Sequence, residues 1–171
     1  VDGVLTDGGL YYSDAGLQMK RFHSRDGLGI KLLLVGGIEV ALLTGDTSPI
    51  AVTRAKRLEI PHALLGVEDK LEALRDLATR LGLDLSQVAY MGDDLNDLGC
   101  LVASGFGACP ADAAPEVRGA ATYVCGLPGG AGCVREVCDL IRHAQQLPVP
   151  TALQGPTVEE PAVDVAFNPT P

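Results

Sequence analysis

Val1-Asp2-Gly3-Val4-Leu5-Thr6-Asp7-Gly8 is the stretch that decides the fold. It places an aspartate directly before a glycine, at the point where we expect a first strand to end. A carboxylate two positions before Asp2 would point to the same face, because side chains along a strand alternate with period two. Two carboxylates could then share one phosphate. Taken by itself, Asp2-Gly3 is also a common turn pair, and a turn explains these two residues equally well.

Strand-like and helix-like segments alternate after this stretch. Residues 9–22 predict a β-hairpin, because two runs of alternating character flank Ser13-Asp14-Ala15-Gly16. Helices are expected at 28–35, 48–58, 70–81, 97–103 and 133–146, and strands at 38–43, 62–65, 88–91, 106–109 and 122–125. This order predicts an α/β fold of three layers, a parallel sheet with helices on both faces. Ligands of such sheets gather at the carboxyl ends of the strands.

Length and composition favour one globular domain. The chain has 171 residues, of which 47% are hydrophobic, enough for a sizeable core. We expect a domain over residues 1–147, followed by a proline-rich, disordered tail or linker over 148–171. The net charge of −9 repels polyanions, so nucleic acid is not an expected partner. A small phosphorylated anion would need a locally positive pocket or a metal ion.

The cysteines and the apolar runs indicate a reducing compartment without a membrane anchor. The five cysteines are an odd number and lack the paired short spacing of a zinc site. Reduced, mostly buried thiols are therefore expected. No apolar run approaches the roughly 20 residues of a membrane span, and no signal peptide is visible. We expect a cytoplasmic protein that does not bind membranes.

Three aspartates follow the strand expected at 88–91. Asp93 and Asp94 come directly after it, and Asp97 stands three residues further on. Carboxylates gathered at a strand end are costly to desolvate without a cation, and oxygen-only ligands suit Mg²⁺. The alternative is an acidic cluster at the start of a helix, where carboxylates are favoured by the helix dipole.

A hydroxyl and a lysine stand at two further element ends. Thr44-Gly45 follows the most apolar strand, which places the Thr44 hydroxyl and nearby backbone N–H groups to hold phosphate oxygens. Lys70 begins a helix and could offset charge on a phosphoryl group. A helical lysine is more often simply solvated. The order of Asp2, Thr44, Lys70 and Asp93 along the chain is more specific than any one of them.

These four motifs together resemble the haloacid dehalogenase superfamily of phosphatases, whose first motif is Asp-x-Asp-Gly. The resemblance implies that Asp2 is the second aspartate of that motif, the acid/base. The nucleophile would stand one residue before Val1, so the chain as given is expected to begin just after it and to be inactive alone. Asp93 would bind Mg²⁺ through its side chain and Asp2 through its backbone carbonyl, with Asp94 supporting the metal. Thr44 and Lys70 would hold the phosphoryl group.

Within the superfamily the chain resembles the capless branch, because residues 2–44 leave no room for a cap domain. The segments Arg25-Asp26-Gly27-Leu28-Gly29-Ile30, 92–97 and 134–140 are similar to those of the 3-deoxy-D-manno-octulosonate 8-phosphate phosphatase family. The resemblance implies a Rossmann-like fold, an aspartyl-phosphate intermediate and a homotetramer joined through the hairpins. Arg25, Asp26, Gly27 and Gly45 would bind the substrate, a small sugar-acid phosphate.

Two departures from the family pattern concern the substrate. The family usually has arginine where this chain has Asp46, and its Gly-Gly-Arg-Gly turn is Gly129-Gly130-Ala131-Gly132 here. Both changes remove positive charge, which leaves open a related nonulosonate 9-phosphate phosphatase. A third hypothesis is a non-catalytic tetramerisation domain, similar to that of acylneuraminate cytidylyltransferases. Such domains tend to lose the acidic motifs, and this chain keeps Asp2, Asp93 and Asp94.

Overall fold

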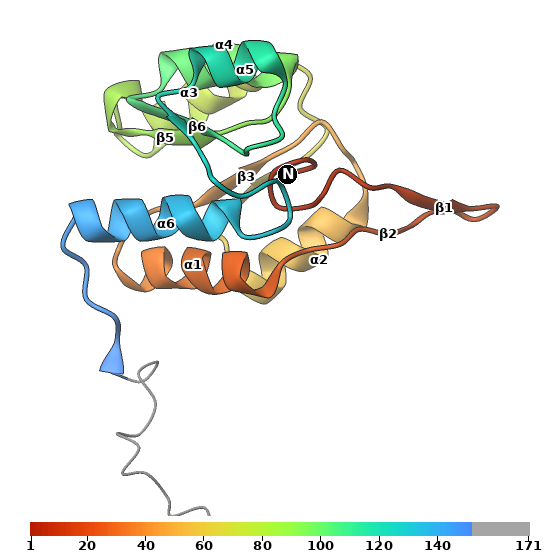
Figure 1. The fold of residues 1–171 in the computed structure, drawn as a ribbon, viewed down its shortest axis with the longest axis horizontal. Helices are drawn as coiled ribbons and strands as arrows, with labels where there is room; N and C mark the ends of the chain where they lie inside the picture. Colours follow the sequence, from red (N-terminus) through yellow and green to blue (C-terminus); the bar gives the residue numbers. More distant parts are fainter. Residues whose placement is uncertain (152–171) are drawn as a thin grey trace, which may run out of the picture.

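The computed structural model describes residues 1–151, apart from the side chains of Leu17 and Gln18. Helices and strands alternate as the sequence predicts (Figure 1). The helices are α1 (Ser24–Val35), α2 (Pro49–Leu58), α3 (Lys70–Arg80), α4 (Leu98–Ala103), α5 (Pro115–Ala120) and α6 (Cys133–Ala144), with short 3₁₀ turns at Leu85–Gln87 and Leu95–Asp97. The strands are β1 (Tyr11–Ser13), β2 (Gly16–Met19), β3 (Ala41–Leu43), β4 (His62–Leu64), β5 (Ala89–Met91), β6 (Phe106–Cys109) and β7 (Tyr123–Val124).

The strands pair as expected in direction but form two parallel sheets in place of one. β3 pairs with β4, while β5, β6 and β7 form a separate three-stranded sheet. Residues 1–6 form turns in which the N–H groups of Val4, Leu5 and Thr6 all point to the Val1 carbonyl. Within the described chain no strand therefore joins β3 to β5. An apolar cavity of about 750 Å³, lined in part by Leu42 and Tyr90, lies between them.

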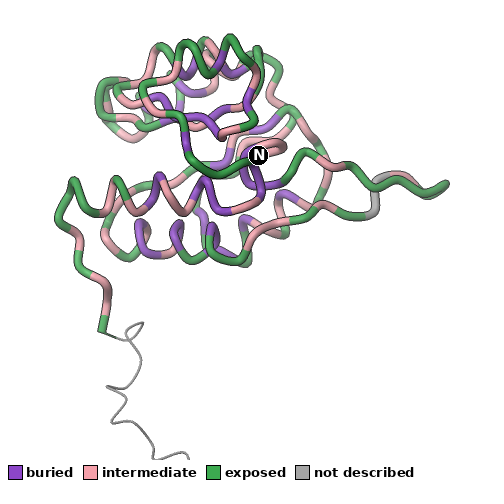
Figure 2. The backbone as a smooth tube through the Cα atoms, viewed as in Figure 1, coloured by how far each residue is buried: buried purple, intermediate pink, exposed green. Residues whose placement is uncertain are grey.

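Two apolar cores give the fold its layers. One core packs α1, α2 and α6 against the sheets and includes Ala108 of β6. The other packs α3, α4 and α5 against β5 and β6 and includes Cys109. Ala108 and Cys109 are neighbours on one strand and face opposite cores, as period two requires. Figure 2 shows the buried residues following these layers, which confirms the predicted arrangement of helices on both sides.

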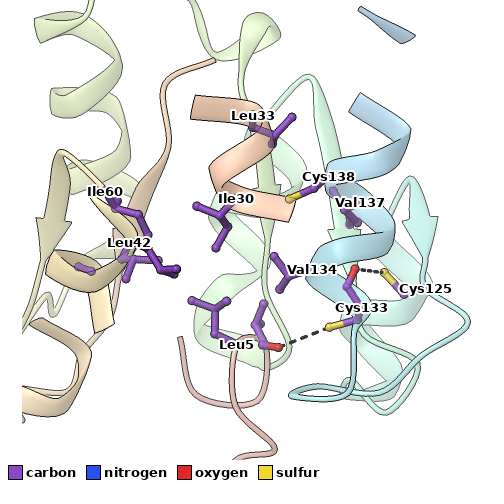
Figure 3. Close-up of a cluster of buried hydrophobic side chains, with 14 residues drawn as sticks. Leu5, Ile30, Leu33, Leu42, Ile60, Cys125, Cys133, Val134, Val137 and Cys138 are labelled. Carbon is purple, nitrogen blue, oxygen red and sulfur yellow. Dashed lines mark hydrogen bonds between the residues drawn. The ribbon is translucent and has the colours of Figure 1, made fainter. Parts of the chain in front are cut away.

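All five cysteines are buried and unpaired, as predicted for reduced thiols. The Cys133 thiol lies within 3.4 Å of the Val4 carbonyl, and the Cys125 thiol lies 3.6 Å from the Cys133 carbonyl (Figure 3). Burial raises the pKa of both thiols to about 12, so they remain protonated at neutral pH. These two cysteines join α6 and β7 to the opening loop.

Local signals in the sequence explain most element boundaries. α2 begins at Pro49 because the Ser48 hydroxyl accepts a hydrogen bond from the Ile50 N–H. α3 begins at Lys70, where the Asp69 carboxylate accepts from Glu72 N–H. The prediction placed the start of α1 too late, since the helix already begins at Ser24. It omitted α5, a short helix that begins at a proline.

The β1–β2 hairpin protrudes from the body of the molecule (Figure 1). Three of its large apolar side chains are well exposed: Tyr11 at 50%, Tyr12 at 69% and Met19 at 62%. In the described part of the chain, no helix combines the length and the apolar character needed to cross a membrane. Most of the tail predicted at 148–171 lies outside the described residues, which end at Thr151.

Candidate active site

The four sequence motifs meet in one polar pocket of about 330 Å³ beside the carboxyl ends of β3 and β5. Thr44 directly follows β3, and Asp93 lies two residues after β5. The pocket brings together most of the predicted site residues, and it is lined by Val1, Asp2, Gly3, Gly8, Thr44, Gly45, Asp46, Lys70, Asp93, Asp94 and Asn96. The strand-end position is the one that parallel sheets use for ligands.

The first and fourth motifs touch at Gly3 and Asp93. A Cβ added at Gly3 would overlap the Asp93 carboxylate, so the backbone of the first motif lies directly against that side chain. Gly3 also has a φ of +67°, a conformation that L-residues rarely adopt. Glycine is therefore favoured at this position for two reasons: its backbone adopts a positive φ, and the Asp93 carboxylate leaves no room for a Cβ. Gly92 is tight for a similar reason, because a Cβ there would overlap Asp97.

Asp97 is the centre of the hydrogen-bond network beneath the pocket. Its Oδ1 accepts from Lys70 Nζ at 2.8 Å and from the Tyr90 hydroxyl at 2.6 Å. Its Oδ2 accepts from the backbone N–H of Asp93 at 3.1 Å. Burial opposes the charge of Asp97, but the Lys70 and Tyr90 hydrogen bonds outweigh it and lower the pKa. Asp97 thus fixes both the position of Lys70 and the loop that carries Asp93.

Asp93 presents the opposite case. Its side chain makes no hydrogen bond or ion pair with any described residue. Burial, followed by the negative charges of Asp97 and Asp94, raises the pKa of Asp93 to about 6. A carboxylate that borders a pocket and lacks a partner is ready to take a cation. Asp94 differs again, because its Oδ1 accepts from the Leu95 N–H at 2.7 Å and caps the following turn.

Lys20 is a site residue that the sequence reasoning missed. Its ammonium group donates to both oxygens of Asp2, at 2.7 and 2.8 Å, and also to Asp46 Oδ2. Burial opposes the charge of Lys20, yet these two carboxylates outweigh it and raise the pKa. Nothing in the local sequence distinguishes Lys20 from a solvated lysine. The one indication in the sequence is the number of aspartates in the motifs, because carboxylates brought together need positive charges nearby.

The glycine-rich turn supports the first motif. The N–H of Gly130 donates to the Val4 carbonyl at 3.0 Å. A Cβ at Gly129 would overlap the Gly3 carbonyl, and one at Gly130 would overlap the backbone of Asp7. The turn therefore packs backbone against backbone beside the pocket, which explains its glycines without a bound ligand.

Arg25, Asp26 and Gly27 lie outside the residues that line the pocket. The Asp26 side chain is only 1% exposed, and its Oδ1 accepts from the Arg135 N–H in the first turn of α6 at 2.7 Å. Gly27 is buried against the Arg54 side chain. Asp26 and Gly27 thus make packing contacts within one chain, and their expected contacts with a substrate stay predictions. Arg25 is exposed, and its contact with a substrate stays a prediction.

The donors present fit a hard cation. Among the described residues, no group of three or more histidine, cysteine, aspartate or glutamate side chains is arranged to hold a metal ion. The expected set requires no such group, because it uses the Asp93 side chain and the Asp2 backbone carbonyl, with Asp94 in support. The Asp2 carboxylate pairs with Lys20, and that of Asp94 accepts from the Leu95 N–H. The unpaired Asp93 carboxylate and the adjacent backbone remain. Mg²⁺ needs no more than one or two carboxylates, because it keeps several waters.

Comparison with known proteins identifies the relatives of this chain. Residues 65–132 match the family model described as haloacid dehalogenase-like hydrolase. The 3-deoxy-D-manno-octulosonate 8-phosphate phosphatase of Yersinia pestis is 43% identical over 145 residues, which are 85% of this chain and 78% of the relative. The chain is thus similar to that enzyme over most of its length.

Two solved structures share the fold. The phosphatase of the same name from Moraxella catarrhalis, in complex with magnesium ion, phosphate ion and a KDO molecule, has a TM-score of 0.83 and 43% identity, over 85% of this chain and 84% of that one. The cobalt-bound enzyme from Haemophilus influenzae has a TM-score of 0.83 and 44% identity, over 85% of each chain. The chain belongs to the 3-deoxy-D-manno-octulosonate 8-phosphate phosphatase family of haloacid dehalogenase-like hydrolases.

Proposed function

We propose that the protein is a Mg²⁺-dependent phosphatase that hydrolyses a sugar-acid phosphate, 3-deoxy-D-manno-octulosonate 8-phosphate, through an aspartyl-phosphate intermediate. One observation carries this proposal. Asp93 lies against the backbone of Gly3, in the same pocket as Thr44 and Lys70. An unpaired carboxylate, a hydroxyl and an ammonium group around one space suit a phosphoryl group and its metal ion.

The attacking carboxylate belongs directly before Val1. Val1 lines the pocket together with Asp2, Lys70 and Asp93. An aspartate attached before Val1 would therefore lie at the edge of this pocket. Its carboxylate would attack phosphorus while the bond from phosphorus to the sugar oxygen breaks.

Asp2 has the position of the acid/base. It lines the pocket two residues after the proposed nucleophile, with its side chain 35% exposed. In the first step its carboxyl group gives a proton to the departing sugar oxygen. In the second step its carboxylate takes a proton from the water that attacks the aspartyl-phosphate, which releases inorganic phosphate and restores both aspartates.

Mg²⁺ would be held by the Asp93 side chain and the backbone carbonyl of Asp2, with Asp94 supporting the loop. When bound, Mg²⁺ neutralises charge on the phosphoryl oxygens and on the carboxylates around them. The Thr44 hydroxyl and the Gly45 backbone would hold phosphoryl oxygens. Lys70, fixed by Asp97 at 2.8 Å, would stabilise the charge that develops in transfer.

Arg25 would bind the carboxylate of the sugar acid from a neighbouring subunit, because it lies outside the pocket of its own chain. This requires an oligomer, and we propose a homotetramer in which the exposed hairpin residues Tyr11, Tyr12 and Met19 pack together. Gel filtration of a Tyr12→Asp variant tests this, and an unchanged elution volume would contradict it.

We also propose a cytoplasmic location, which the unpaired cysteines support.

Phosphate release tests the function. The assay uses the chain extended upstream of Val1 by an apolar strand that ends in aspartate, as the family pattern has it. We expect phosphate from 3-deoxy-D-manno-octulosonate 8-phosphate with Mg²⁺ and none with EDTA. Changing the added aspartate to asparagine should abolish release. A nonulosonate 9-phosphate in the same assay tests the related specificity that Asp46 and Ala131 leave open. No release from any sugar-acid phosphate would favour a non-catalytic tetramerisation domain.

A further inference from the structure

Lys20 carries an ammonium group that is enclosed beneath two partly solvated carboxylates. The side chain of Lys20 is 1% exposed, whereas those of Asp2 and Asp46 are 35% and 23% exposed. Both aspartates line the pocket. A dry cation thus supports two anions that face the space where the substrate would lie. Burying a lysine costs free energy that only well-placed partners offset, so this arrangement is specific.

The contacts of Lys20 fix the orientation of the Asp2 carboxylate. Both oxygens of Asp2 accept from the ammonium group, at 2.7 and 2.8 Å. The Thr6 hydroxyl lies 3.4 Å from Oδ1 and completes the set. Thr6 itself is fully buried, so it cannot move aside easily. A carboxylate held at both oxygens has little freedom to rotate.

Asp46 anchors Lys20 to the loop that carries the phosphate-binding hydroxyl. The Asp46 Oδ1 accepts from the Ser48 N–H at 2.9 Å, and the Asp46 N–H donates to Thr44 Oγ1 at 3.2 Å. Lys20 therefore ties the loop of the first motif to the loop of the second. The family that this chain resembles usually has arginine at position 46, and Asp46 gives Lys20 a second acidic partner in this chain.

We propose that Lys20 is a positioning residue that holds the Asp2 carboxyl group toward the leaving-group oxygen, with Asp46 as the anchor of Lys20. The proposal rests on the proposed function, because it concerns the proton transfer assigned to Asp2. Lys20 itself need not touch the substrate. Its role is to keep Asp2 within reach of the departing oxygen, and displacement of a catalytic group by about 1 Å can cost about 100-fold in rate.

A positioning role of Lys20 differs from a purely structural one in its effect on the rate, because the rate loss should depend on whether the leaving group needs a proton. A sugar phosphate has an alkoxide leaving group that must be protonated as the bond to phosphorus breaks. The p-nitrophenyl phosphate ester has a leaving group that departs readily without a proton. Losing the position of Asp2 should therefore slow formation of the aspartyl-phosphate much more from the sugar phosphate than from the aryl phosphate, whereas hydrolysis of that intermediate is common to both esters. Loss of folding would slow both equally.

The experiment compares Lys20→Met, Lys20→Arg and a control in the chain extended upstream of Val1. The control is Arg21→Met, because Arg21 stands next in sequence but is 58% exposed and pairs with Asp7 away from the pocket. For Lys20→Met we expect kcat/KM, which reports the formation of the aspartyl-phosphate, to fall about 100-fold on the sugar phosphate and no more than about threefold on p-nitrophenyl phosphate. Lys20→Arg should recover part of the loss, and Arg21→Met should match the wild type.

Equal losses of kcat/KM on both esters, or no loss on either, would overturn the role of Lys20 and leave the phosphatase function intact. Failure of the unmutated extended chain to release phosphate from either ester would instead refute the proposed function. The circular dichroism spectrum of each variant confirms that it folds before its rate is interpreted.

Discussion

Replacing Asp93 with asparagine should stabilise the metal-free protein at neutral pH. The side chain of Asp93 makes no hydrogen bond with a described residue, so the asparagine amide loses no partner, and the substitution removes a charge that burial and Asp97 disfavour. The pKa of Asp93 rises from its ordinary 3.8 to about 6 on folding. A shift of this size corresponds to about 3 kcal/mol at pH 8 in favour of the variant.

The pH dependence follows from the direction of this shift. Because the pKa of Asp93 is higher in the folded state, the folded protein binds the proton more tightly than the unfolded chain. The cost of Asp93 is therefore absent well below pH 3.8, grows as the pH rises, and is complete above pH 6. At pH 5 the advantage of Asp93→Asn should be about half its value at pH 8.

Urea denaturation of both proteins in EDTA, at pH 5 and pH 8, measures these differences. The control is Asp76→Asn on α3, which removes an exposed aspartate and should change the free energy of unfolding by less than about 0.5 kcal/mol. Mg²⁺ at about 1,000 times Kd should reverse the order, because only the wild type gains from binding, by about 4.1 kcal/mol. A less stable Asp93→Asn in EDTA at pH 8, or a difference that does not vary with pH, would refute the reasoning.

Three further substitutions test the network around this carboxylate. Gly3→Ala should cost about 1–3 kcal/mol more than Gly37→Ala in thermal unfolding, because both positions have positive φ but only a Cβ at Gly3 meets Asp93. Asp97→Asn should lower the free energy of unfolding by about 3 kcal/mol at pH 7, and the difference should shrink as the pH falls below 3.8, since folding lowers the pKa of Asp97. Lys70→Met should destabilise to a similar extent at pH 7 in urea, because it leaves Asp97 buried without its cation.

The fold class and the pocket could be predicted because they depend on periodicity and on element ends. Helix α3 was correctly placed, within one residue at its end, from leucines three to four residues apart. Thr44 and Asp93 were correctly placed at strand ends, and parallel topology then brought them into one pocket.

What the sequence did not reveal are the long-range partners of charged side chains. Lys20 and Asp46 are 26 residues apart, and no local pattern links them. The Asp26 carboxylate accepts a hydrogen bond from Arg135 N–H, 109 residues away. A carboxylate in the first turn of a helix can face a ligand or the N-terminus of another helix, and both are favourable electrostatically. The packing of α1 against α6 brings this carboxylate to the start of α6, and its contact with a substrate stays a prediction.

The three aspartates of the fourth motif show how partners divide the roles of identical side chains. Asp97 accepts from two strong donors, Lys70 and Tyr90, which stabilise its negative charge within the protein. Asp94 is exposed and accepts a backbone N–H, so it holds the turn. The Asp93 side chain has no such donor among the described residues, and its charge is disfavoured in the folded protein. We therefore expect the carboxylate that destabilises the metal-free state to be the one that gains most from a divalent cation, which would tie metal binding and stability to the same group.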